Sequence, residues 1–123
     1  MIDELKKLII DRLKVIHNES LLALANHPSI KEKAYGDKIY GAEYKGKNAN
    51  IVFLIDTNND FVNAIEELKS EGIIDVKPID LLSTVLDGDI YDMPIAKHVR
   101  IYAKPHWMPI ELILNKIDRN RQK

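Results

Sequence analysis

The sequence contains no cysteine among its 123 residues. Disulfide bonds, zinc sites built on thiolates and cysteine nucleophiles are therefore excluded. A chain without cysteine fits a reducing compartment, and we expect a cytoplasmic location. None of the motifs in the sequence implies a cofactor, and we expect none.

The sequence also lacks a long hydrophobic run. No apolar stretch is longer than Ile51–Ile55, whereas a membrane-spanning helix needs roughly 18 apolar residues. The first ten residues, MIDELKKLII, are interrupted by charges at Asp3, Glu4, Lys6 and Lys7, unlike the apolar core of a signal peptide. We therefore expect neither a membrane segment nor a membrane partner.

The composition is that of an ordinary globular protein, with 46% hydrophobic and 30% charged residues. This length predicts a single domain over residues 1–123. The net charge of −1 conceals a segregation along the chain: residues 56–92 carry two basic and ten acidic residues, whereas residues 97–123 carry seven basic and two acidic ones. Such segregation predicts either local surface fields or two segments that neutralise each other when packed.

Helical periodicity dominates the first third of the chain. Apolar residues recur with a period near 3.6 over residues 3–16, and charged residues fill the other side. A second short helix is expected over residues 20–26, with Asn18 or Ser20 as its cap. Residues 29–36 predict a third, because a serine and a glutamate have capping-box spacing and a glycine follows.

Three further helices are predicted downstream. The clearest covers residues 58–72, with Asn59 or Asp60 as its cap and a glycine at its end. Residues 80–88 read as a short helix, and residues 108–118 as a last one with a proline near its first turn. The predicted inner stripe of the first of these helices is Phe61, Ile65 and Leu68.

Strand patterns alternate with these helices, and the predicted class is α+β. A helical N-terminal third precedes a small, mostly antiparallel or mixed sheet packed against helices. Residues 38–46 and 48–56 form a predicted hairpin, whose continuously apolar second strand is expected to be central. Residues 73–79 and 96–104 complete the predicted strands. The strand–helix–strand piece Ile51–Val76 fits either a right-handed βαβ crossover or half of a ferredoxin-like sandwich.

The stretch AKHVRIYAKPHW, residues 96–107, is the most distinctive candidate site. Alternation in a strand places His98, Arg100, Tyr102 and Lys104 on one face. Basic side chains with an interleaved aromatic ring can hold phosphates and stack a base, with His106 as a further contact. The same pattern is typical of the ordinary outer face of a half-solvated strand. The only tryptophan, at position 107, is expected to anchor the last helix on the sheet.

An acidic group, Asp87, Asp89 and Asp92, is the candidate surface for a protein partner. Carboxylates this close together favour a basic partner through electrostatic steering. They also resemble cation ligands, but the closing glutamate of a calcium loop is missing, and Asp-Gly pairs are standard turn chemistry. We therefore predict no metal site.

Glu43, Lys45 and Asp56 form a third candidate group. Two acids that hold Mg²⁺ and a lysine that steadies a phosphate are the elements of a metal-dependent phosphodiesterase. Alternating glutamate and lysine is equally typical of an exposed strand. The stretch DTNND, residues 56–60, is better explained by helix capping than by ligand binding, and no serine stands in a nucleophile elbow.

By elimination, the sequence favours a non-catalytic binding or regulatory module that engages a protein partner. An inhibitor or immunity-like role is one form of such a module. The alternatives are a nucleic-acid-binding protein that uses the basic and aromatic strand face, and a metal-dependent phosphodiesterase. The oligomeric state is left open by the sequence.

Overall fold

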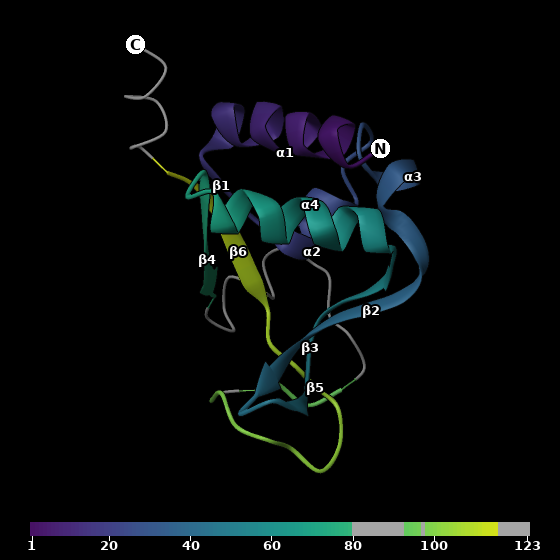
Figure 1. Ribbon diagram of the computed structural model, residues 1–123, viewed down its shortest axis with the longest axis vertical. Coiled ribbons are helices and arrows are strands. Elements are labelled where there is room, and N and C mark those ends of the chain that lie inside the picture. The colour runs from purple at the N-terminus through teal and green to yellow at the C-terminus, as the bar shows by residue number, and fades with distance from the viewer. Residues whose placement is uncertain (80–92, 97, 116–123) are drawn as a thin grey trace.

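The computed structural model describes residues 1–79, 93–96 and 98–115, and this part of the chain has the predicted α+β class (Figure 1). None of the described helices is both long and apolar enough to span a membrane. In chain order the elements are α1 (Ile2–Ile16), β1 (Asn18–Ser20), α2 (Leu21–Ala25), α3 (Lys31–Ala34), β2 (Tyr35–Tyr44), β3 (Lys47–Thr57), α4 (Asn59–Ser70), β4 (Ile74–Pro78), β5 (His106–Trp107) and β6 (Ile110–Leu114).

The helices α1 and α4 pack side by side, and the β2–β3 hairpin extends to the end of the molecule away from α1 (Figure 1). Lys6 on α1 reaches across to α4, where its Nζ lies 2.7 Å from Glu67 Oε1. The buried stripe of α1 repeats every four residues, as a 3.6-residue period requires. Its members, Leu5, Ile9 and Leu13, belong to one core cluster that also contains residues of α4 and of both sheets.

The helix α4 begins one residue earlier than the sequence indicates. Asn58, not Asn59 or Asp60, is the cap: its backbone is extended, and its side-chain oxygen accepts a hydrogen bond from the Phe61 N–H at 2.9 Å. Asn59 and Asp60 already belong to the first turn, where their own side chains cannot cap. The predicted inner stripe is confirmed, since Phe61, Ile65 and Leu68 are all buried.

The short helix α3 has no capping box. It begins at Lys31, and the Ser29 hydroxyl lies 2.8 Å from His27 Nδ1 instead of bonding to the helix. Gly36 does not end this helix but lies inside β2. A Cβ atom at Gly36 would lie 2.5 Å from the backbone oxygen of Thr57, so glycine is required because the two strands approach closely there.

The strands of the described residues form two three-stranded sheets. In one, β6 lies between β1 and β4, and both pairings are antiparallel. In the other, β3 pairs with β2 in antiparallel and with β5 in parallel. Because β3 and β4 lie in different sheets, the piece Ile51–Val76 is neither a βαβ crossover nor half of a ferredoxin-like sandwich.

The β2–β3 hairpin is confirmed, with a tighter turn than expected. Lys45 and Gly46 have φ angles of 54° and 79°, the positive values that a two-residue hairpin turn matched to strand twist requires. The second strand therefore resumes at Lys47. Its apolar run Ile51–Ile55 lies in the middle strand of its sheet, as predicted.

The predicted last helix is wrong, because residues 110–114 form the strand β6. Burial alternates along it: Ile110, Leu112 and Leu114 are buried, while Glu111 and Ile113 are partly exposed. The local sequence suits both periods, since apolar residues also occur at helical spacing. Pairing with β1 on one side and β4 on the other decides the outcome.

The hydroxyl of Tyr40 on β2 is buried and has a carboxylate partner. This arrangement makes the stability of the protein depend on pH in the alkaline range. The hydroxyl donates to Glu66 Oε2 at 2.6 Å; burial first, and then this hydrogen bond, raise the pKa of Tyr40 far above its ordinary value. An unfolded tyrosine ionises near pH ~10. The folded state therefore binds the extra proton above that pH, and stability must fall as pH rises by up to about 1.4 kcal/mol per unit.

We expect Tyr40→Phe to remove this dependence. Near pH 8 the variant should be less stable by about 1–2 kcal/mol, because a hydrogen bond to a charged group is lost. The difference should shrink as pH rises above about 10. Urea unfolding of both proteins at several pH values measures it. A difference that stays constant with pH would show that Tyr40 ionises normally.

Candidate binding surface

The predicted strand over residues 96–104 is absent. None of its described residues belongs to a strand. His98, Arg100 and Lys104 are exposed, as expected of the outer side, but the predicted alternation of buried and exposed residues is wrong. Val99 and Ile101, expected on the sealed side, are 56% and 47% exposed, whereas Tyr102, expected on the outer side, is 7% exposed. The alternating residues form a loop instead of a strand. Tyr102 points inward because its backbone bonds to the hairpin, and Val99 and Ile101 are left exposed.

Tyr102 fastens this loop to the β2–β3 hairpin. Its backbone N–H donates to the Ala49 oxygen at 2.9 Å, and its carbonyl accepts from Asn50 Nδ2 at 2.8 Å. Its hydroxyl donates to the His98 oxygen at 2.8 Å. These three bonds close the loop on itself and hold it against β3.

The ring of Tyr102 brings the other predicted residues together. The His106 ring stacks on it with centroids 4.0 Å apart, and Arg100 Cζ lies 4.7 Å from its centroid, within the range of a cation–π contact. His106 Nδ1 lies 2.7 Å from the Lys104 oxygen, and because a carbonyl only accepts, Nδ1 carries the hydrogen. The five residues His98, Arg100, Tyr102, Lys104 and His106 thus gather in a closed loop instead of along a strand face.

The outer side of this loop, residues 98–104, combines aliphatic and basic groups, and we call it the exposed loop. Val99 and Ile101 flank Arg100, and all three are exposed. Within the described part of the chain, no carboxylate lies within 4.0 Å of Arg100 or Lys104. The Tyr102 ring itself is covered, so it offers no free face on which a base could stack.

Asp87, Asp89 and Asp92 lie outside the described residues, as does the predicted helix over residues 80–88. Their role in partner binding therefore stays a prediction.

The phosphodiesterase candidates are far apart. Glu43 pairs with Asn48 near the hairpin turn, and Lys45 lies in that turn. Asp56 comes eight positions after Asn48, about 25 Å away along an extended strand. In the described ranges, no three histidine, aspartate or glutamate side chains are grouped to hold a metal ion. Glu43, Lys45 and Asp56 therefore do not form one catalytic site.

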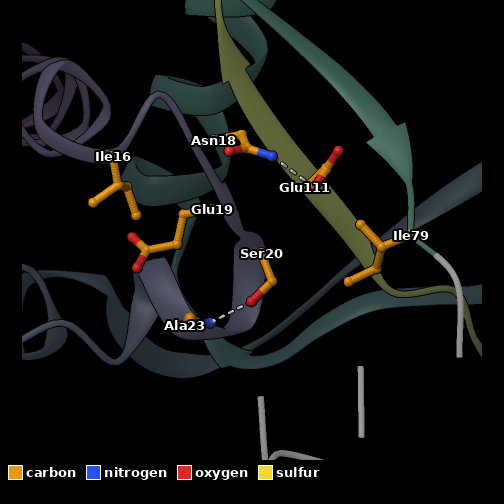
Figure 2. Close-up of a pocket in the computed structure, with 7 residues that line it drawn as sticks. All are labelled: Ile16, Asn18, Glu19, Ser20, Ala23, Ile79 and Glu111. Atoms are coloured by element: carbon orange, nitrogen blue, oxygen red, sulfur yellow. Dashed lines mark hydrogen bonds between the residues drawn. The ribbon is translucent and has the colours of Figure 1, made fainter. Parts of the chain in front are cut away.

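A small pocket lies where β1 and β6 meet the C-terminal end of α1 and the start of α2 (Figure 2). Its volume is about 250 Å³. Sequence reasoning missed it, because its lining comes from segments that only the tertiary fold brings together. The lining residues are Ile16, Asn18, Glu19, Ser20, Ala23, Ile79 and Glu111.

The polar side chains of this pocket are engaged within the protein. Glu19 accepts two hydrogen bonds from the Arg12 guanidinium, at 3.0 and 2.8 Å, and these bonds raise the pKa of Arg12. Asn18 donates to Glu111 at 3.3 Å, and Ser20 is the N-cap of α2, as one of the predicted alternatives has it (Figure 2). These contacts join α1, β1 and β6. Because the polar groups of the pocket are already engaged, the exposed loop is the stronger candidate for binding a partner.

No protein-family model, curated protein or solved structure matches the chain.

Proposed function

We propose that the protein is a non-catalytic binding module whose exposed loop engages a protein partner. The observation that carries this proposal is the exposure of Val99 and Ile101 on either side of Arg100. The centre of a protein interface is more apolar than the remaining surface, and arginine is enriched there. Burial of both aliphatic side chains against a partner would contribute roughly 1 kcal/mol or more each.

The shape of the loop supports binding as well as its composition. Tyr102 holds the loop through bonds to Ala49, Asn50 and His98. A loop that is already ordered loses less conformational entropy when it binds, so more of the contact energy appears as affinity. A module of this kind acts by covering or positioning its partner, and inhibition is one form of that action.

A nucleic acid is the second candidate partner. The exposed cations Arg100 and Lys104 favour it, because phosphate contacts supply most of the affinity of non-specific binding. The buried ring of Tyr102 disfavours it, because stacking on single-stranded bases needs a free aromatic face. Loss of affinity with rising salt in a mobility-shift titration is the signature of this alternative.

Site-directed photo-crosslinking tests the proposed function. We expect Val99→p-benzoylphenylalanine, expressed in the native host, to give a discrete protein adduct on irradiation. Val15→p-benzoylphenylalanine is the matched control, because Val15 is also an exposed valine but lies on α1. Arg100→Glu in the position-99 background should abolish the adduct.

Two results would contradict the proposal. One is the same adduct pattern at positions 99 and 15, which would indicate non-specific contact. The other is no protein adduct at position 99 together with crosslinking to nucleic acid, which would favour the second candidate.

A further inference from the structure

We infer that the partner presents an acidic protein segment, and that the tip of the β2–β3 hairpin binds it together with the exposed loop. This inference rests on the proposed function and adds the chemistry of the partner and a second contact element. The juxtaposition that carries it is that of Lys45 and Lys47 with Arg100 and Lys104 at one end of the molecule. We call these four residues the basic end.

The two halves of the basic end are far apart in sequence but adjacent in space. The Tyr102 N–H bonds to the Ala49 oxygen, and Asn50 bonds back to the Tyr102 carbonyl. Ile51 of β3 pairs with His106 of β5. Figure 1 places the hairpin tip and the β5 region together, away from α1.

The basic end has a clear excess of positive charge. Residues 43–50 and 98–108 contain four lysines or arginines and one acidic residue, Glu43. All four cations are exposed. Across residues 1–79, 93–96 and 98–115, none of them lies within 4.0 Å of a carboxylate, whereas Lys6, Lys7 and Arg12 on α1 are all in ion pairs.

Aromatic rings hold two of these cations in place. Lys45 Nζ lies 5.3 Å from the centroid of the Tyr44 ring, and Arg100 lies over Tyr102. Such contacts orient a cation while leaving its charge uncompensated. Positive charges that have no carboxylate partner among the described residues, and that surround exposed aliphatic side chains, are complementary to a surface that carries carboxylates around an apolar residue.

A protein segment fits this surface better than a nucleic acid does. Val99 and Ile101 are exposed on either side of Arg100, and a phosphate backbone offers no apolar group to bury them. The Tyr102 ring is covered, and Tyr44 is partly buried beneath the lysine that follows it. A single strand would therefore find charge here but little stacking surface.

Fluorescence anisotropy with two defined probes tests the inference. One probe is a labelled peptide of repeated Glu-Glu-Leu triplets, and the other is a labelled oligothymidylate of the same net charge. Both are titrated with the full chain at about 50 and 200 mM salt. The variant pair Lys45→Gln/Lys47→Gln is compared with Lys14→Gln/Lys31→Gln, which removes the same charge from exposed positions on α1 and α3.

We expect the peptide to bind more tightly than the oligothymidylate at both salt concentrations. The hairpin variant should weaken peptide binding about fivefold or more, and the helix variant less than about twofold. Val99→Ser/Ile101→Ser should weaken the peptide and leave the oligothymidylate unchanged.

Tighter binding of the oligothymidylate, equal losses in both lysine pairs, or no binding of the peptide would each overturn the inference. Photo-crosslinking at position 99 tests the proposed function independently of these titrations. A protein adduct there, combined with a negative peptide titration, would keep the protein partner and reject its acidic chemistry.

Discussion

Replacing Trp107 with alanine should destabilise the protein by about 3–5 kcal/mol. The indole is 2% exposed and is among the largest fully buried side chains. The neighbouring backbone adds to its importance: the Trp107 N–H donates to the Pro94 oxygen at 2.8 Å, and its carbonyl accepts from Ala96 N at 2.7 Å. Met108 N also bonds to the Val52 oxygen, so the segment around Trp107 lies between residues 94–96 and the strand β3. Removal of the ring leaves a cavity where these three segments meet.

Urea and thermal unfolding followed by far-ultraviolet circular dichroism measure this effect. Circular dichroism is needed because the variant has lost the only tryptophan fluorophore. A loss of this size corresponds to a fall in Tm of about 10–20 °C. Trp107→Phe should cost less, and Val15→Ala, at an exposed position on α1, should stay within about 0.5 kcal/mol of the parent. A cost below about 1 kcal/mol for Trp107→Ala would place the indole outside the core.

Leu112→Ala should cost about 2–5 kcal/mol, and Ile113→Ala only about 1 kcal/mol. In the strand β6, Leu112 faces the core with no exposed surface, while Ile113 is partly exposed. A helix over the same residues would reverse the order, because Ile110, Ile113 and Leu114 would share the buried stripe. A comparison of the unfolding free energies of the two variants therefore shows whether residues 110–114 form a strand or a helix.

The two substitutions are matched in position, and each removes a similar aliphatic side chain. Midpoints of urea unfolding with unchanged slopes would give the difference directly. Equal costs at both positions, or a larger cost at Ile113, would contradict the burial pattern of β6, in which Leu112 faces the core and Ile113 does not.

The candidate site over residues 98–106 stays a prediction, and its conformation differs from the strand that the sequence favours. His98, Arg100, Tyr102, Lys104 and His106 were identified as a group because basic and aromatic residues are dense there. The alternation of apolar and polar residues did not predict which of these side chains are buried and which are exposed. Tyr102 turns inward because the hairpin offers partners for its N–H and carbonyl, and Val99 and Ile101 are left outside. Lys45 and Lys47 come near this group only through contacts between segments some fifty residues apart.

Local interactions determined the elements that the sequence predicts correctly. The helix α1 and the helix α4 have apolar stripes at the helical period, and the β2–β3 hairpin has a glycine in a two-residue turn. Side chains three or four residues apart, or directly across a hairpin, decide such elements, so their signal lies within a short window. The α+β class follows from these elements alone.

Tertiary structure decided the rest. Residues 110–114 became a strand because β1 and β4, distant in sequence, supply hydrogen-bonding edges on both sides. Residues 98–104 became a loop because Tyr102 finds its partners in β3 and in the loop itself. In both segments the local pattern is compatible with two conformations, and long-range hydrogen bonds and burial select between them.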